Sequence, residues 1–252
     1  MSQNYISVVM PAYNAQTYIE QAIESVLLQT CTDFELIVVD DASTDKTYDI
    51  VHKYELKDSR VRCYKNETNS GVAYSRNFGV QQAKYDWIAF IDSDDCWRED
   101  KLQKQVEVAN KDIADIIYTG YGFMDSEGTM SKNVFRVPTR TVYKELLKQN
   151  VMSCSGIMLR KELLKTHTMK HDAVHEDFYT WLTMLRDGAV AIGIDEPLHT
   201  VRTAMKESKS GNKFKSAIMT YKTYRLLGLP WYRSLYYFAF YMYRNIKKYS
   251  KI

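Results

Sequence analysis

Three aspartates crowd into the loop that follows a short apolar segment in the first half of the chain. Asp92, Asp94 and Asp95 come directly after Trp87–Ile91, a continuous apolar run that is typical of a strand buried on both faces. Like charges this close repel one another, so the cluster needs a partner of opposite charge. Carboxylate oxygens suit hard divalent cations such as Mg²⁺ and Mn²⁺. The loop is therefore a candidate metal site, with open coordination positions for water or substrate phosphates.

A purely structural role is the alternative, because aspartate often ends strands and caps helices. A cap needs one carboxylate, whereas this loop has three, so we favour the metal site here. The earlier acidic pair Asp40 and Asp41 is more ambiguous. Ser43 or Thr44 could simply cap a helix that begins near Asp45.

The order of elements explains how these acidic loops could meet. Four apolar segments alternate with segments of helical spacing, and Asn14 is a candidate cap for the first helix. The predicted strands are Tyr5–Met10, Phe34–Val39, Arg60–Tyr64 and Trp87–Ile91, and the third predicted helix is Ala73–Ala83. This alternation predicts an α/β fold with a parallel sheet covered on both faces, whose ligands bind beyond the carboxyl ends of the strands. Neither GxGxxG nor GxxxxGK[ST] occurs, so the acidic edge is not a Rossmann or P-loop site.

Composition limits the classes of protein. A chain of 252 residues with 45% hydrophobic content can bury roughly three quarters of its unfolded surface in one core. The net charge of +3 is too small to indicate nucleic acid, so we expect no nucleic-acid partner. Four isolated cysteines suit a reducing compartment. We see neither a secretory signal nor an apolar stretch long enough for a membrane span, and we expect a cytoplasmic protein.

Four segments of the first half together resemble family 2 glycosyltransferases of the GT-A fold. They are "ISVVMPAYNAQTYIEQAIESVLLQT", "FELIVVDDASTDKT", "NSGVAYSRNFGV" and "WIAFIDSDDCW". The resemblance implies a doubly wound, mostly parallel sheet, a nucleotide-diphosphosugar donor, Mn²⁺ or Mg²⁺, and inversion at the anomeric carbon. We expect a catalytic domain over residues 1–212, with a donor half (1–112) and an acceptor half (113–212), and then a helical, aromatic and basic tail (213–252).

The nucleobase side of the donor pocket follows from the resemblance. Pro11, Tyr13 and Asp41 match the family positions there, and Asp40 would support the loop. An Asp41 carboxylate that accepts from the imide N–H of uracil would favour a UDP-sugar. The alternative for Tyr13 is a plain turn aromatic that packs on the first helix.

The diphosphate side holds the three clustered aspartates and an arginine. Asp92 resembles the family residue near the ribose and diphosphate, and Asp94 resembles the direct metal ligand. Asp95 could assist either role, and the sequence does not separate the three. Arg76, on the helix after the "NSG" turn, could meet the diphosphate or could form a surface salt bridge.

A later segment, "EPLHTVRTAMKESKSGNK", resembles the PLxxYRxxxxSxS strand and flexible loop of the family. Arg202 fits the arginine and is expected to bind the donor. The family tyrosine is replaced by Val201. A histidine that some relatives carry is Ala204 here, so a contact of that histidine with the metal or the diphosphate is absent. Compensating charge or polarity is expected from Lys206, Ser208, Lys209 or Ser210.

Inverting transfer is a single displacement in which an acceptor hydroxyl attacks the anomeric carbon while the nucleoside diphosphate leaves. A carboxylate must take the proton of the acceptor. The segment "VHEDFYTWLTMLRDG" places Glu176 and Asp177 at the start of a helix. The family carries an acidic pair there whose aspartate is the base, so the resemblance implies Asp177 as base and Glu176 as a supporting or acceptor-binding residue. The alternative is that both acids only complement the helix dipole.

The segments "YTGYGFMDSEG", "NVMSCSGIMLRKELL" and "EDFYTWL" resemble bacterial enzymes of teichuronic acid, capsule or O-antigen synthesis. We therefore expect transfer of a hexose from a UDP-sugar to a saccharide linked to lipid through a diphosphate, at the inner face of the cytoplasmic membrane. The identity of the hexose is not encoded in any motif. Two alternatives stay open: a non-catalytic nucleotide-sugar-binding scaffold, and a haloacid-dehalogenase-like phosphatase, whose DxD usually continues with Thr or Val rather than with Asp95-Cys96.

The tail from Leu229 reads "LPWYRSLYYFAFYMYRNIKKYSKI". Its uncharged stretch Ser234–Tyr243 is too short to span a bilayer, and its tyrosines are typical of interfacial segments. Either it packs on the catalytic domain as a helix, or it anchors the protein on an anionic membrane surface. One face of such a helix would hold Trp231, Leu235, Phe238 and Met242.

Overall fold

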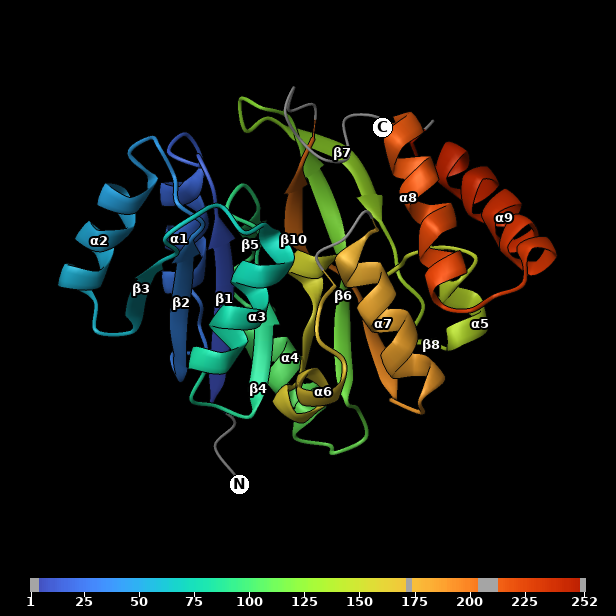
Figure 1. The fold of residues 1–252 in the computed structure, drawn as a ribbon. Helices are drawn as coiled ribbons and strands as arrows, with labels where there is room; N and C mark the ends of the chain where they lie inside the picture. The colour runs from blue at the N-terminus through green and yellow to red at the C-terminus, as the bar shows by residue number, and fades with distance from the viewer. Residues whose placement is uncertain (1–4, 171–173, 204–212, 250–252) are drawn as a thin grey trace.

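The computed structural model describes residues 5–170, 174–203 and 213–249 (Figure 1). The residues expected to compensate for Ala204, from Lys206 to Ser210, lie outside this part of the chain. The donor half contains β1 (Ile6–Ala12), α1 (Ile19–Leu27), β2 (Phe34–Asp40), α2 (Thr47–Lys57), β3 (Val61–Lys65), α3 (Val72–Gln82), β4 (Trp87–Phe90), β5 (Cys96–Trp97) and α4 (Lys101–Ala109). The remainder contains β6 (Ile116–Met124), β7 (Met130–Phe135), β8 (Arg140–Thr141), α5 (Tyr143–Leu146), η1 (Cys154–Gly156), β9 (Met158–Arg160), α6 (Lys161–Thr166), α7 (Glu176–Arg186), β10 (Ala191–Arg202), α8 (Lys213–Leu226) and α9 (Trp231–Tyr249).

One continuous sheet runs through the molecule in the order β3-β2-β1-β4-β9-β6-β10-β5, with β7 on β6 and β8 on β10. The first four strands are parallel, as are β6 and β10. Strand β9 lies antiparallel between β4 and β6 and so joins the two halves. The predicted α/β fold with a mostly parallel central sheet and a helical C-terminal part is confirmed.

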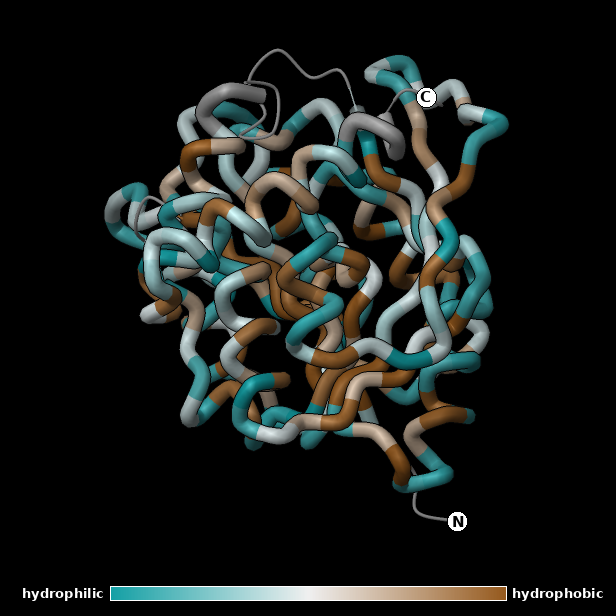
Figure 2. The backbone as a smooth tube through the Cα atoms, turned by 90° about the vertical axis from the view of Figure 1, so that its right-hand side faces the viewer, coloured by the Kyte–Doolittle hydropathy of each residue, from teal (hydrophilic) through white to brown (hydrophobic). Residues whose placement is uncertain are grey.

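Helices cover both faces of the sheet. Helices α1, α2 and α4 pack on one face, and α3, α5, α6, α7 and α8 pack on the other. The strands alternate between these two apolar layers, so Val8 faces the first layer and Val9 the second. Figure 2 shows hydrophobic strands gathered in the interior and hydrophilic loops around them. Burial of the strands on both faces explains their nearly continuous apolar sequences.

The strand register brings the predicted site loops to one edge. Ala12 at the end of β1 pairs with Asp40 at the end of β2, and Val9 pairs with Phe90 of β4. Because these strands are parallel, the residues that follow them leave the same edge of the sheet. The loops of Tyr13, Asp41 and Asp92 therefore start as neighbours.

The predicted helix caps are wrong. Neither Asn14 nor Ser43 nor Thr44 caps a helix, because α1 begins at Ile19 and α2 at Thr47, each without a side-chain cap. These polar residues join the two loops instead. The Asn14 backbone N–H donates to Ser43 Oγ (2.9 Å), and the Thr44 N–H donates to Asn14 Oδ1 (2.9 Å). Long-range bonds thus replace the local bonds that the sequence suggested.

The tail forms two antiparallel helices at one end of the molecule (Figure 1). Tyr237, Phe238 and Tyr241 of α9 pack against the core, while Trp231 and Leu235 are exposed. Trp231, Leu235 and Phe238 lie within about 60° of one another around α9, and Phe238 is at the edge of this side that turns towards the core. None of the helices within the described ranges is both long and apolar enough to cross a membrane.

Candidate active site

A buried arginine joins the two halves of the protein. Arg76 lies on α3 and is only 4% exposed. Its Nη2 donates to Asp92 Oδ1 (2.6 Å), and its Nη1 donates to Glu176 Oε1 (3.1 Å). Burial would lower the pKa of Arg76, but the carboxylates of Asp92, Glu176 and Asp177 outweigh it and keep the pKa well above the usual range. The surface salt bridge considered for Arg76 is therefore wrong, because Arg76 and Glu176 are buried and the two ion pairs of Arg76 span the candidate site.

The aspartate loop is held by buried bonds to η1. Ser155 Oγ donates to Asp95 Oδ2 (2.5 Å) and accepts the backbone N–H of Asp92 (3.0 Å). Asp95 is 3% exposed, and burial together with the neighbouring carboxylates of Asp94 and Asp92 raises its pKa well above the usual range. The side chain of Asp92 is 37% exposed. Asp95 thus holds the loop on η1 through its buried bond with Ser155, while Asp92 is accessible to a ligand.

Arg202 also binds the protein itself. Its Nε donates to the Asp94 carbonyl (3.0 Å), its Nη1 to the Asp125 carbonyl (3.0 Å) and its Nη2 to Gln21 Oε1 (2.6 Å). Its backbone N–H donates to Asp95 Oδ1 (3.0 Å). All three guanidinium nitrogens are thus engaged in this structure, which makes Arg202 a brace between the aspartate loop, α1 and the β6–β7 turn.

Asp41 holds the loop between β3 and α3. Its Oδ1 accepts from the Asn66 amide (2.7 Å) and the Ser70 N–H (2.9 Å), and its Oδ2 accepts the Gly71 N–H (2.7 Å). A carboxylate has about four acceptor positions, so these bonds leave room for one more on Oδ2. The predicted bond from Asp41 to a uracil imide is compatible with this geometry and stays a prediction.

The remaining nucleobase positions differ in exposure. Tyr13 is 49% exposed, so the alternative of a turn aromatic packed away on the first helix does not describe it. Pro11 is buried inside β1, in register with Val39. Tyr13 offers a ring to a ligand, whereas Pro11 supports the loop from within the strand.

The acidic pair begins α7, as the sequence predicted. Glu176 is buried and paired with Arg76, while Asp177 is half-buried and its Oδ1 accepts the N–H of Phe178 (2.7 Å). Burial and the adjacent Glu176 carboxylate raise the pKa of Asp177, against the opposing effect of Arg76 and His175. A carboxylate with a raised pKa is a stronger proton acceptor, which suits general base catalysis.

Asp92 and Asp94 fit a cation that arrives with a substrate. Burial, together with the neighbouring Asp92 carboxylate, raises the pKa of Asp94 to about 6, and a bound cation would relieve this repulsion. Within the described ranges, no group of three or more His, Cys, Asp or Glu side chains is placed to hold a metal ion. Mg²⁺ commonly takes only one or two protein carboxylates and completes its coordination with water and substrate phosphates.

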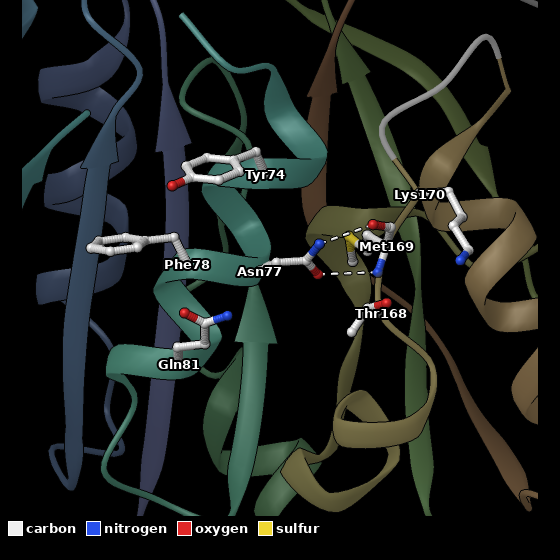
Figure 3. A pocket seen from close by; sticks show the side chains of 7 residues that line it. All are labelled: Tyr74, Asn77, Phe78, Gln81, Thr168, Met169 and Lys170. Carbon is white, nitrogen blue, oxygen red and sulfur yellow. Dashed lines mark hydrogen bonds between the residues drawn. The ribbon is translucent and has the colours of Figure 1, made fainter. Parts of the chain in front are cut away.

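A separate cavity of about 380 Å³ opens on the outer side of α3. Figure 3 shows its lining residues, none of which carries a carboxylate: Tyr74, Asn77, Phe78, Gln81, Thr168, Met169 and Lys170. Asn77 forms two bonds with the backbone of Met169, one to its carbonyl (2.9 Å) and one from its N–H (3.0 Å). This cavity is distinct from the acidic site. The two bonds between the Asn77 side-chain amide and the Met169 backbone hold the segment that leads towards α7.

Two residues that contact the site were not identified in the sequence analysis. Ser155 and Gln21 are common polar residues in segments without a motif for their role. Their partners, Asp95 and Arg202, are 60 and 181 residues away in the chain. An aligned set of related sequences showing that each pair varies together could have found them.

Comparisons with known proteins agree with this geometry. The model of the family "Glycosyl transferase family 2" matches residues 7–168. The putative teichuronic acid biosynthesis glycosyltransferase TuaG of Bacillus subtilis is 38% identical over 220 residues, covering 87% of each chain. The Escherichia coli protein WfgD, named UDP-Glc:alpha-D-GlcNAc-diphosphoundecaprenol beta-1,3-glucosyltransferase, is 36% identical and covers 85% of this chain and 83% of its own.

A solved structure shares the fold. The structure of Staphylococcus aureus TarS 1–349 in complex with UDP-GlcNAc superposes with a TM-score of 0.76. It is 23% identical and covers 96% of this chain and 73% of that chain. This likeness concerns the arrangement of the backbone.

The buried ion bridge should dominate the stability of the site. We expect Arg76→Gln to lower the free energy of unfolding by about 3–5 kcal/mol, because it breaks the buried Arg76–Glu176 pair by removing the charge of one partner. The matched control is Arg98→Gln, since Arg98 pairs with Asp100 and Glu196 at the surface and such pairs contribute about 0–1 kcal/mol. Urea unfolding followed by circular dichroism measures both. Equal losses in the two variants would contradict the role of the bridge.

Proposed function

The chain belongs to glycosyl transferase family 2, and from this membership we propose that it moves a hexose from a UDP-sugar to a lipid-linked saccharide during synthesis of a bacterial surface polysaccharide. The observation that carries the proposal is the Arg76 bridge between Asp92 and Glu176. This bridge places a loop suited to a metal diphosphate beside the acidic start of α7. A donor site and a proton acceptor therefore share one location.

In this proposal the donor lies across the loops at the edge of the sheet. The exposed ring of Tyr13 stacks on the uracil, and Asp41 accepts the imide proton at its remaining position. Asp94, with Asp92, would hold Mn²⁺ or Mg²⁺. When bound, such a cation neutralises charge on the leaving diphosphate. Arg76 adds positive charge beside Asp92.

Other predicted donor residues act through their neighbours. Arg202 positions the Asp94 loop, because its guanidinium already binds three partners in the protein. Asp95 holds the same loop through its hydrogen bond with Ser155 of η1. Pro11 supports the turn that carries Tyr13.

Asp177 is the proposed base. Its raised pKa favours proton uptake from an acceptor hydroxyl, which then attacks the anomeric carbon from the side opposite the leaving diphosphate and inverts the configuration. Glu176 supports this arrangement by keeping Arg76 in place at the start of α7. The base and the aspartate loop thus lie on two sides of one guanidinium.

The acceptor class is inferred from the relatives. The name of WfgD gives a GlcNAc-diphosphoundecaprenol acceptor. The lipid part of such an acceptor is held in a bilayer. We therefore place this enzyme peripherally at the inner face of the cytoplasmic membrane, where a nucleotide-sugar and a lipid-linked acceptor can meet. In this arrangement residues 1–112 bind the donor, residues 113–212 shape the acceptor site, and residues 213–252 form the tail.

A panel of UDP-sugars tests the proposal as a whole. With MnCl₂ present, we expect UDP release from one or a few UDP-hexoses, and a faster release when a GlcNAc-diphospho-lipid is added. Binding of UDP without any turnover would favour the scaffold alternative. Release of phosphate from phosphomonoesters, without action on UDP-sugars, would favour the phosphatase alternative.

The metal assignment is tested by Asp94→Asn. The substitution keeps the shape of the side chain but removes its charge, so we expect the affinity for UDP in the presence of Mn²⁺ to fall at least about 10-fold, or 1.4 kcal/mol. Asp49→Asn, an exposed carboxylate on α2, is the matched control and should bind as the unaltered protein does. Isothermal calorimetry with and without Mn²⁺ measures the change. If the affinity of Asp94→Asn for UDP in the presence of Mn²⁺ is unaltered, Asp94 is not the metal ligand and another residue must hold the metal.

The base is tested by Asp177→Asn. Transfer should fall by about 10² or more while UDP binding survives, because the amide cannot accept a proton. In the unaltered enzyme, activity should fall as the pH decreases through the pKa of Asp177, which lies above the usual aspartate range because of burial and Glu176.

The pH profile of the variants completes this test. Asp187→Asn, at the other end of α7, should retain both the rate and the loss of activity at low pH. In Asp177→Asn the residual activity should no longer depend on pH in that range. An Asp177→Asn enzyme with a near-normal rate would transfer the role elsewhere, with Glu176→Gln the next variant to measure.

A further inference from the structure

We propose that the outer face of α9 rests on the surface of an anionic lipid bilayer. The proposal rests on the proposed function for its biological reason, since a lipid-linked acceptor requires a membrane nearby. Its structural evidence is independent of the active site. It comes from the exposed side chains of α9, from the distribution of charge along the chain and from the contacts between α9 and α7.

The outer α9 face is a continuous aromatic and apolar stripe. Its members recur at spacings of three and four residues, which places them on one side of a helix. They are Trp231, Tyr232, Leu235, Tyr236, Phe240 and Tyr243, exposed by 64, 55, 48, 53, 39 and 66%. The opposite side of α9 is already used, because Ser234 is fully buried and Tyr237, Phe238 and Tyr241 pack against the core. An exposed apolar patch of this kind marks an interaction surface.

The charge of the chain is strongly segregated. From Ser208 to Ile252 the sequence holds seven lysines and three arginines and neither aspartate nor glutamate. The whole chain has 34 basic and 31 acidic residues, so residues 1–207 carry 24 and 31 of them, a net charge of −7. Basic residues near an anionic membrane are attracted to its surface. The same field repels the acidic body, so it orients the protein with the tail towards the membrane.

The chemistry of the stripe favours a bilayer surface over a protein partner. Tyrosine and tryptophan have an apolar ring and a polar edge, which suits them to the boundary between headgroups and acyl chains. Helix α9 cannot cross a membrane, so it would lie in the plane of the interface. A second copy of the chain is a poor occupant, because two tails with nine basic residues each would repel one another.

The inner side of α9, together with α8, packs against the start of α7, where the proposed base lies. Phe178, the residue after Asp177, packs with its ring 5.6 Å from that of Tyr241 on α9 and 6.2 Å from that of Tyr224 on α8. His175, just before the acidic pair, contacts the Ser216 carbonyl on α8 (Nε2 to O 3.1 Å). A tail docked on the bilayer would therefore hold the start of α7 at a defined height above the lipid surface.

The test is sedimentation of the full chain with vesicles, without donor or acceptor. At low salt we expect the protein to sediment with phosphatidylglycerol vesicles, to remain in solution with phosphatidylcholine vesicles, and to dissociate as salt is added. The triple variant Leu235→Ser, Tyr236→Ser, Phe240→Ser should lose at least about 10-fold in bound fraction. The matched control replaces Leu56, Ile113 and Val142 by serine, which are exposed by 74, 54 and 52% away from α9, and it should bind normally.

Three outcomes would overturn the proposal. The unaltered protein could stay in the supernatant with phosphatidylglycerol, or the α9 variant could sediment as the control does while circular dichroism shows both folded. Alternatively, gel filtration could show a dimer that the α9 variant abolishes, which would make the face an interface between two copies.

This assay is separable from the proposed function. Vesicle binding without transfer from any UDP-sugar would refute only the proposed activity. Transfer to a short-chain acceptor without vesicle binding would refute only the docking surface.

Discussion

The site depends on one buried guanidinium. Removing the Arg76 charge from water is costly, and the cost is offset only when carboxylates lie against it. One of these carboxylates, Asp92, lies just after β4 in the donor half, and the other, Glu176, starts α7, 100 residues after Arg76 in the chain. A movement of either segment would take a carboxylate away from this buried guanidinium. The relative position of the two halves is therefore fixed by electrostatics at the place where the chemistry is proposed to occur.

Burial divides the candidate ligand-binding residues of the site into two groups. Asp95 and Arg202 have the residue types of ligand-binding groups, yet each is buried and binds the protein's own backbone or side chains. Asp92 and Tyr13 remain accessible to a ligand. The buried group keeps the accessible group in place, which is the preorganisation that catalysis by positioning and electrostatics needs. Residue type alone does not distinguish the two groups, because the distinction lies in their exposure.

The sequence predicted the local features well and the long-range polar contacts poorly. The apolar segments placed β1 to β4 within one or two residues, because burial on both faces leaves a strong local pattern. The caps expected from Asn14 and Ser43 were wrong because these side chains found partners in another loop. The spacing in α9 did not show which side meets the core, because both sides of this helix are apolar. The bond from Ser155 to Asp95 had no local signature at all.

Helix α7 connects chemistry and docking through adjacent residues. Consecutive side chains on a helix point about 100° apart, so Asp177 can face the acidic site while Phe178 enters the aromatic cluster with Tyr224 and Tyr241. The raised pKa of Asp177 depends on burial beside Glu176, and the packing of Phe178 maintains that burial. Loosening the tail would therefore expose the start of α7 to water and lower the basicity of Asp177. The packing of the tail on Phe178 thus supports the candidate active site, and this holds for any surface that the outer side of α9 contacts.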